Sequence, residues 1–305
     1  MQIYLPIANM SINALAMILL GGGVGLLSGM FGVGGGFLTT PLLIFYGIPP
    51  AVAAASAATQ VTGASVSGLL AHFERDGVDI PMGAFLAVGG LIGALAGAGI
   101  FELLRSLGQI DTAISILYVI LLGWIGSLMA RDAWRDIVAA RSGQALAPRR
   151  RNHHPLIASL PLRWRFYKSG IYVSPLAPLM LGFVTGIMTV LLGVGGGFIM
   201  VPAMIYLLGM ATRVVVGTSL LQIVVVTAFT TMVHALTTQA VDIVLAGLLL
   251  IGGVIGAQFG TRLAAKLQPQ KLRMLLAVIV LAVALRMLLG LSFRPSDVFT
   301  IDMLS

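Results

Sequence analysis

Gly32-Val33-Gly34-Gly35-Gly36-Phe37 is a run of residues that occurs twice in this chain and decides its fold. The second copy is Gly193-Val194-Gly195-Gly196-Gly197-Phe198, and a proline follows each copy at the same distance, at Pro41 and Pro202. With two single-residue insertions, the register continues through Gln60 and Gln222, His72 and His234, and Val78-Asp79-Ile80 and Val241-Asp242-Ile243. A repeat of this length predicts two homologous halves.

The composition around the repeats is that of a membrane protein. Of the 305 residues, 58% are hydrophobic and 9% are charged, whereas a soluble domain carries about a quarter charged residues. The mean hydropathy is +1.04, and the first Asp, Glu, Lys or Arg in the chain is Glu74. The chain has no cysteine, which excludes disulfides, thiolate metal sites and cysteine relays.

Each half divides into five apolar segments bounded by turn signals. Most segments approach the ~20 residues that a helical bilayer crossing needs. The second segment of each half has 12 residues, and its length of about 18 Å falls short of a ~30 Å hydrocarbon core. We expect it to be a half-helix joined to irregular glycine-rich backbone, buried in protein or lining a wet cavity. The segments are 12–31, 37–48, 51–73, 82–104 and 110–130, then 176–193, 197–208, 213–235, 243–265 and 271–291.

Most of the positive charge lies in one loop. The net charge is +8, and residues 131–172 hold nine basic and two acidic residues, a net charge of +7. A single basic loop between apolar blocks predicts a cytoplasmic loop under the positive-inside rule. No nucleic-acid-binding motif surrounds the loop, so we expect the lipid bilayer, and not nucleic acid, as a partner.

The loops between the fourth and fifth segments indicate how the halves are oriented. The first of these loops has a net charge of −1 and the second +4, which fits inverted halves with the first loop outside and the second inside. The loop containing Glu74 has a net charge of −2 and would be cytoplasmic, which keeps parallel halves as the alternative.

We therefore predict an all-α polytopic membrane protein that consists of two inverted five-segment repeats, each with a glycine-rich broken helix. Both termini would then lie outside the cell. The expected parts are a first transmembrane repeat (1–130), a basic cytoplasmic loop (131–175), a second transmembrane repeat (176–291) and a C-terminal tail (292–305).

The glycine runs indicate an anion site. Inverted repeats with paired broken helices are the general build of a secondary transporter, with the substrate at the midplane. The candidate glycines leave no side chain to block a ligand, and the helix after each run begins with unpaired N–H groups and a positive dipole end. The alternative role for these glycines is close helix packing. They are Gly34, Gly35 and Gly36 in the first half, and Gly195, Gly196 and Gly197 in the second.

Polar side chains of the second and third segments complete the candidate substrate site. Hydroxyls and amides can donate to sulfur or carboxyl oxygens and still release the ligand, although each could instead bond a neighbouring helix. His72 and His234 end the third segments, where proton coupling and capping of a helix end are the two interpretations. The polar candidates are Thr39, Ser56 and Gln60, and in the second half Thr218, Ser219 and Gln222.

The sequence resembles the TauE/SafE sulfite exporter family, also called the TSUP permeases. The resemblance rests on the doubled Gly-Val-Gly-Gly-Gly-Phe-x-x-x-Pro, on Val-Val-Gly-Thr-Ser-Leu-Leu at 215–221, on the two Val-Asp-Ile motifs, and on Gly-Ala-x-x-Gly at 93–97 and 256–260. It covers nearly the whole chain except the termini and the 131–172 loop. It is specific for the family and not for the substrate.

This resemblance implies movement of a small sulfur-containing anion, such as sulfite, sulfoacetate or a related sulfonate, across a bacterial inner membrane, often outward. It implies an anion between the two glycine runs, with Gln60, Thr218, Ser219 and Gln222 around it. The first half departs from the pattern, because Ala55-Ser56-Ala57 stands where the second half has Gly217-Thr218-Ser219, so we expect an asymmetric site.

Alternating access between the two repeats is the expected mechanism. Outward movement of an anion from a cell that is negative inside requires no coupling ion, since the potential itself drives it. Import of an organosulfur or other small anion, or a passive anion channel, are the alternatives. An enzyme is not expected, because the acidic residues lie at segment ends or in loops. We expect no cofactor and no metal, and the sequence does not indicate an oligomeric state.

Overall fold

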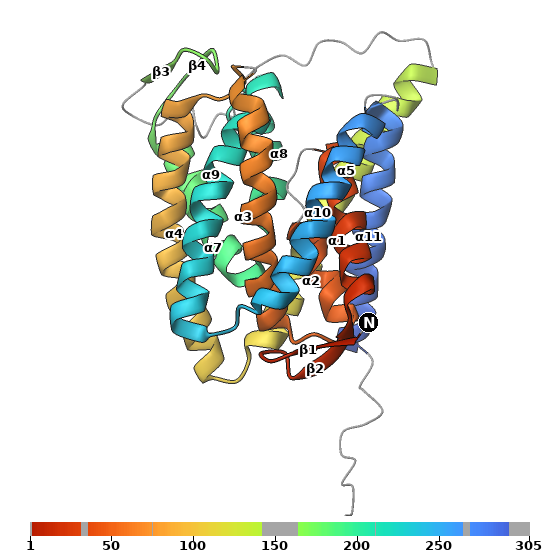
Figure 1. Cartoon of the computed structure of the whole chain (residues 1–305). Coiled ribbons are helices and arrows are strands. Elements are labelled where there is room, and N and C mark those ends of the chain that lie inside the picture. The colour runs from red at the N-terminus through yellow and green to blue at the C-terminus, as the bar shows by residue number, and fades with distance from the viewer. Residues whose placement is uncertain are drawn as a thin grey trace, which may run out of the picture.

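The computed structural model describes residues 2–31, 36–74, 76–141, 164–210, 212–264 and 269–292. Within these ranges the chain is a bundle of helices with one short β-hairpin at each end (Figure 1). The first half contains β1 (Gln2–Leu5), β2 (Met10–Asn13), α1 (Ala14–Phe31), α2 (Gly36–Phe45), α3 (Pro50–Glu74), α4 (Ile80–Ser106) and α5 (Ile110–Arg141). The second half contains β3 (Trp164–Phe166), β4 (Ile171–Val173), α7 (Leu176–Leu192), α8 (Gly197–Tyr206), α9 (Thr212–Val233), the π-helical turn η1 (His234–Thr238), α10 (Ile243–Ala264) and α11 (Pro269–Ser292).

The prediction of an all-α polytopic membrane protein is confirmed. Within the described ranges, five helices are long and apolar enough to cross a membrane, and α2 and α8 are short helices of 10 residues each, as expected for the second segments. The outer helices carry large apolar side chains that are exposed, as lipid contact requires. Examples are Leu95, Leu103, Ile120, Trp124, Ile255, Phe259 and Leu285.

The broken helix of each half turns back within the bundle. Met17 near the start of α1, Leu43 near the end of α2 and Val52 at the start of α3 belong to one buried cluster. The second half repeats this arrangement, with Ala177 of α7, Met204 of α8 and Val214 of α9 in another cluster. The α1–α2 and α7–α8 pairs therefore enter and leave on the same side, and α3, α4 and α5 connect the two sides of the bundle (Figure 1).

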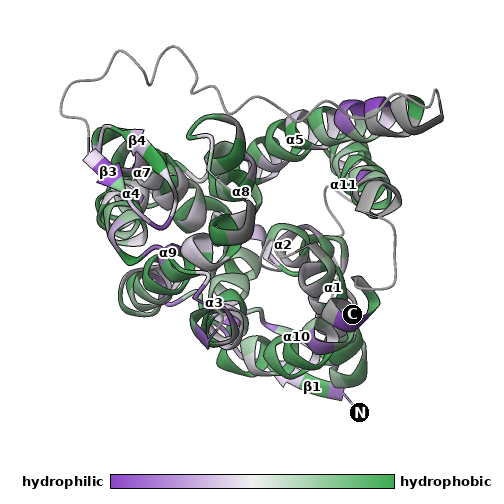
Figure 2. Cartoon of the chain, turned by 90° about the horizontal axis from the view of Figure 1, so that it is seen from above, coloured by the Kyte–Doolittle hydropathy of each residue, from purple (hydrophilic) through white to green (hydrophobic). Residues whose placement is uncertain are grey.

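Each half packs most closely against the other half rather than against itself. α1 lies along α10 and α4 lies along α7, as the view from above also shows (Figure 2). Glycines make these approaches possible: a Cβ on Gly25 would lie 2.2 Å from the Gly253 carbonyl oxygen, and one on Gly93 would lie 2.0 Å from the Phe183 carbonyl oxygen. The Gly-Ala-x-x-Gly motifs therefore join the halves.

The third helices of the two halves run antiparallel to each other. The Thr59 hydroxyl lies 3.3 Å from that of Thr231, and the Thr62 hydroxyl donates to Thr227 at 2.8 Å, so the partner number falls as the first rises. Equivalent helices in opposite directions are the arrangement that an inverted repeat requires.

The two hairpins were not predicted from the sequence, and each reaches across to the other half. The backbone N–H of Ser169, between β3 and β4, donates to Asp79 Oδ2 at 2.9 Å, and the Ser169 hydroxyl donates to the same oxygen. The backbone N–H of Ile7, between β1 and β2, donates to Asp242 Oδ2 at 3.3 Å. Asp79 and Asp242 are thus equivalent anchor points at opposite ends of the bundle.

Candidate anion site at the glycine turns

The second glycine run forms a turn that only glycine accommodates. Gly193, Gly195 and Gly196 have φ angles of +69°, +73° and +76°, which side chains rarely adopt. A Cβ on Gly195 would also lie 2.6 Å from a Val61 methyl carbon. This turn ends α7 at Leu192 and starts α8 at Gly197, as predicted for a broken helix. Gly34 and Gly35 of the first run lie outside the described residues.

The two broken helices meet at the starts of α2 and α8. A Cβ on Gly36 would lie 2.7 Å from the Gly193 carbonyl oxygen and 2.9 Å from that of Val194. The rings of Phe37 and Phe198 stack at 4.4 Å with an interplanar angle of 3°. α2 approaches this point from the lower side and α8 from the upper side (Figure 1). The N-terminal N–H groups and positive dipole ends of two helices thus lie close together inside the protein.

The C-terminal end of α7, in contrast, has its carbonyl groups bonded within the protein. The Leu192 carbonyl oxygen accepts from the Thr40 hydroxyl at 3.1 Å and from the Tyr118 hydroxyl at 2.5 Å. The Val190 carbonyl oxygen lies 3.0 Å from His234 Nε2. These bonds satisfy the negative end of α7, while the positive end of α8 faces it across the turn.

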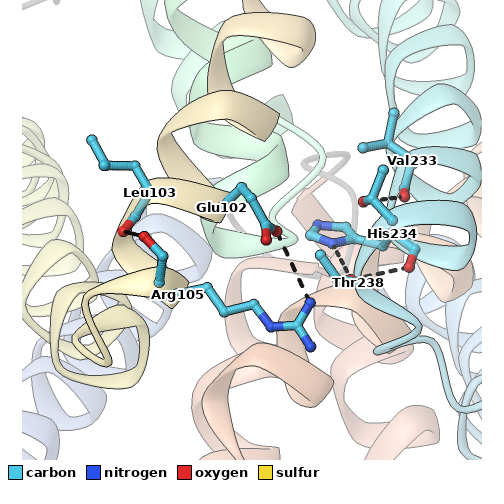
Figure 3. Close-up of polar contacts among 8 residues, drawn as sticks. Glu102, Leu103, Arg105, Val233, His234 and Thr238 are labelled. Carbon is cyan, nitrogen blue, oxygen red and sulfur yellow. Dashed lines mark hydrogen bonds and ion pairs between the residues drawn. The ribbon is translucent and has the colours of Figure 1, made fainter.

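His234 is buried and its ring is held on both nitrogens. Besides the Val190 contact, its Nδ1 lies 3.2 Å from the Thr238 hydroxyl (Figure 3). Its ring meets that of Phe101 edge-on, with the ring centroids 4.8 Å apart. The structure therefore places His234 after α9 and against the C-terminal end of α7, and proton coupling stays a prediction. His72 lies in the last turn of α3, where it is half-buried.

Gln60 is anchored to the start of α2. Its Oε1 accepts from the Thr39 hydroxyl at 2.9 Å, and both side chains are buried. Its Nε2 lies beside α10, 2.9 Å from where a Cβ on Gly253 would be. Two of the predicted site residues, Thr39 and Gln60, are thereby brought together at the first turn of α2.

Gln222 occupies the equivalent place in the second half without an equivalent partner. Its Nε2 lies beside α4, 3.1 Å from where a Cβ on Gly90 would be, and Gly90 is the repeat counterpart of Gly253. The side chain is fully buried, and both Oε1 and Nε2 lack a hydrogen-bond partner. The residue that corresponds to Thr39 is Met200, which offers no hydroxyl. The buried amide of Gln222 is therefore unsatisfied, and the repeat pairs it with the first turn of α8, where Met200 stands.

The predicted hydroxyls at 56, 218 and 219 bond within the protein. Thr218 Oγ1 accepts from the Asp79 backbone N–H at 3.0 Å, and Ser56 Oγ accepts from the Asp242 backbone N–H at 3.2 Å. The Ser219 hydroxyl donates to the Val216 carbonyl oxygen at 2.9 Å. The first two contacts are a symmetric pair that fastens the Val-Asp-Ile turns, and none of these three hydroxyls bonds the Gln222 amide.

The electrostatics of the site come from neutral groups. Among the described residues, Asp79 and Asp242 are the buried carboxylates, at 1% exposure each, and no lysine or arginine is buried. The same part of the chain shows no group of three or more histidine, cysteine, aspartate or glutamate residues that could hold a metal ion. The groups of the predicted site that can donate to an anion are therefore helix N-termini and the amide of Gln222.

Some residues of structural importance were not identified from the sequence. Asp79 and Asp242 were visible as a repeated Val-Asp-Ile, but that motif did not reveal their role as hairpin anchors and caps. Asp79 Oδ1 accepts from the Met82 backbone N–H at 3.1 Å, and Asp242 Oδ1 accepts from the Leu245 backbone N–H at 3.1 Å. Tyr118 gave no sequence signal, because its repeat counterpart is not a tyrosine.

Comparison with known proteins shows the family. The family described as "Sulfite exporter TauE/SafE" matches residues 17–287. A probable membrane transporter protein, YjnA of Bacillus subtilis, is 28% identical over 90% of this chain and 100% of its own length. A probable membrane transporter protein of Xylella fastidiosa is 31% identical over 90% of this chain and 95% of its own length. No solved structure matches. The chain belongs to the sulfite exporter TauE/SafE family of membrane transporters.

Proposed function

We propose that this protein is a secondary transporter that moves a small sulfur-containing anion, such as sulfite, sulfoacetate or a related organosulfonate, by alternating access. The observations that carry the proposal are the meeting of the α2 and α8 N-termini and the unsatisfied buried amide of Gln222, which the repeat pairs with the first turn of α8. Helix N-termini attract anions through free N–H groups and the helix dipole. Family membership supports a transporter, and the names of the relatives leave the substrate open.

The binding site on this proposal is centred on the second glycine turn. Gly195, Gly196 and Gly197 expose backbone, α8 supplies N–H groups, and Gln222 supplies an amide. Gly36 and Phe37 bring the first broken helix against this turn. In the first half, Thr39 and Gln60 bond each other, so the Gln60 Oε1 atom is not available to a ligand. The site is asymmetric because one glutamine is bonded within the protein and its counterpart is not.

Alternating access on this proposal moves two bodies that each combine helices of both halves. One body contains α1 and α10, and the other contains α4 and α7, since these pairs pack through glycine contacts that leave little room for sliding. α2 is continuous with the first body and α8 with the second. Rocking the bodies about the α3–α9 contact separates or closes the two helix N-termini, which changes the side from which the anion is accessible.

Orientation and direction follow from charge. The described parts of the basic loop, the end of α5 and the β3–β4 hairpin, lie at one end of the bundle, and the N-terminal hairpin lies at the other (Figure 1). The positive-inside rule places the basic end in the cytoplasm of a bacterial inner membrane and the termini outside. Export of an anion is then favoured by the membrane potential, by about 2.3 kcal/mol per charge per 100 mV.

Counterflow in proteoliposomes tests the proposal. Vesicles preloaded with unlabelled sulfite should take up labelled sulfite faster than empty vesicles, and the uptake should saturate. A channel would conduct labelled sulfite without acceleration by internal sulfite. The Gln222→Met variant should lose the exchange. Thr230→Val is the matched control, because Thr230 is a buried α9 residue whose hydroxyl also lacks a partner. Absence of exchange in folded protein, with sulfite and with sulfoacetate, would refute the proposed substrate class.

A further inference from the structure

The two equivalent glutamines differ in the hydrogen bonds of their amides, and this difference indicates which groups a ligand must carry. The repeat places the Gln60 and Gln222 amides in matching positions, each beside a glycine of the other half, Gly253 and Gly90. Thr39 satisfies Gln60 Oε1 from the first turn of α2. No described residue does so for Gln222, and Met200 stands at the matching position of α8.

Both polar atoms of the Gln222 amide are unsatisfied, and they require opposite partners. The Nε2 group donates and therefore bonds an oxyanion oxygen, whereas the Oε1 atom only accepts and therefore repels an oxyanion oxygen. In the first half the group that fills the place opposite Oε1 is a hydroxyl, that of Thr39. A ligand that satisfies Gln222 must likewise present a donor next to its anionic oxygens.

We infer that the substrate of this site is a sulfur oxyanion or sulfonate that also carries an O–H or N–H donor, in place of the missing threonine hydroxyl. Hydrogen sulfite and 2-hydroxyethanesulfonate have this chemistry, whereas ethanesulfonate and sulfate at neutral pH do not. The anionic oxygens bond Gln222 Nε2 and the N–H groups at the start of α8, and the donor bonds Gln222 Oε1. This inference rests on the proposed function and narrows its substrate.

The size of the discrimination follows from the cost of an unpaired acceptor. A site built to bond a substrate hydroxyl rejects an analogue without it, because the buried protein acceptor is then left without a partner. For a single neutral acceptor this corresponds to about a tenfold to a hundredfold weaker binding. No lysine or arginine is buried among the described residues. The preference for a ligand with a donor is therefore not masked by a stronger charge–charge attraction.

A matched pair of sulfonates tests the inference. 2-Hydroxyethanesulfonate and ethanesulfonate have the same charge and carbon chain and differ by one hydroxyl. 2-Hydroxyethanesulfonate should inhibit labelled-sulfite counterflow at concentrations at least about ten times lower than ethanesulfonate requires. The same ratio should hold for the concentrations that raise the melting temperature of the detergent-solubilised protein. In Gln222→Met, which should not exchange sulfite, the ratio of the two sulfonate concentrations that raise the melting temperature should approach one, and in Thr230→Val it should stay at the wild-type value.

Three results distinguish this inference from the proposed function. Equal inhibition of wild-type exchange by the two sulfonates overturns the donor requirement and leaves the transporter intact. A wild-type ratio that persists in Gln222→Met shows that another residue accepts from the ligand's donor, and it also overturns the inference. No exchange and no thermal stabilisation by either sulfonate removes the proposed function, and this inference with it.

Discussion

Replacement of the two equivalent glutamines by methionine should change stability in opposite directions. Gln222→Met removes an amide that is fully buried and has no partner, and it introduces the residue type already present at Met200. Gln60→Met removes an amide whose Oε1 accepts a 2.9 Å hydrogen bond from Thr39. Glutamine and methionine have similar length and flexibility, so each substitution mainly exchanges a polar end for an apolar one.

The expected magnitudes follow from the hydrogen-bond inventory of each residue. A buried polar group without a partner costs about 1–3 kcal/mol, so Gln222→Met should stabilise the ligand-free protein by up to that amount. Loss of a satisfied hydrogen bond costs about 0.5–1.5 kcal/mol, so Gln60→Met should destabilise it. The two variants are expected to differ by about 2 kcal/mol or more in the free energy of unfolding.

Thermal unfolding in one detergent at one scan rate is the assay, because the unfolding of such proteins is often irreversible and depends on scan rate. The melting temperature of Gln222→Met should lie above that of the wild type, and that of Gln60→Met below it. A fall in both variants by a similar amount would refute the reasoning, since it would show that the Gln222 amide has a partner in the ligand-free protein. Saturating substrate should reverse the order of Gln222→Met and wild type.

Three further predictions concern the glycine turn and the hairpin anchors. Gly195→Ala should abolish exchange and cost about 1–2 kcal/mol from left-handed backbone alone, whereas Gly247→Ala, where a Cβ meets nothing within 4 Å, should be neutral or stabilising; circular dichroism melts and counterflow measure both. Tyr118→Phe should cost only about 0.5–1.5 kcal/mol in the same melts, because Thr40 still donates to the Leu192 carbonyl oxygen; a larger loss would contradict that shared cap. Asp79→Ala should release the β3–β4 hairpin, seen as faster proteolysis near Lys168, while Asp111→Ala on the exposed start of α5 should not; equal cleavage in both would argue against the anchor.

The helices could be predicted because the repeated motifs consist largely of glycine and proline, and these residues affect the backbone locally. The short α2 and α8 followed from the same runs, and the lipid-facing helices followed from hydropathy. The hairpins did not, since strands of three or four residues leave no periodic signal. Their attachment to Asp79 and Asp242 joins residues far apart in the sequence, which no local pattern encodes.

The candidate site was predicted as a set of residue types, and the structure divides that set. Thr39 of α2 bonds Gln60, and Gln222 is the unpartnered repeat counterpart of Gln60, whereas Ser56 and Thr218 hold backbone N–H groups of the Val-Asp-Ile turns. The sequence shows that methionine replaces Thr39 in the second half. The consequence for Gln222 required the Thr39–Gln60 contact, which only the structure supplies.

The exchange of helices between the halves also sets an order of assembly. α7 is separated from α4 by α5 and the basic loop, so it can dock on α4 midway through synthesis. α1, in contrast, must wait for α10, which begins at Ile243. Until then the glycine face of α1 has no protein surface to cover it. Contacts between residues so distant along a chain slow folding. The first body of the transporter is therefore completed last, and a ribosome-bound chain that stops before α10 should hold α4 and α7 together while α1 remains undocked.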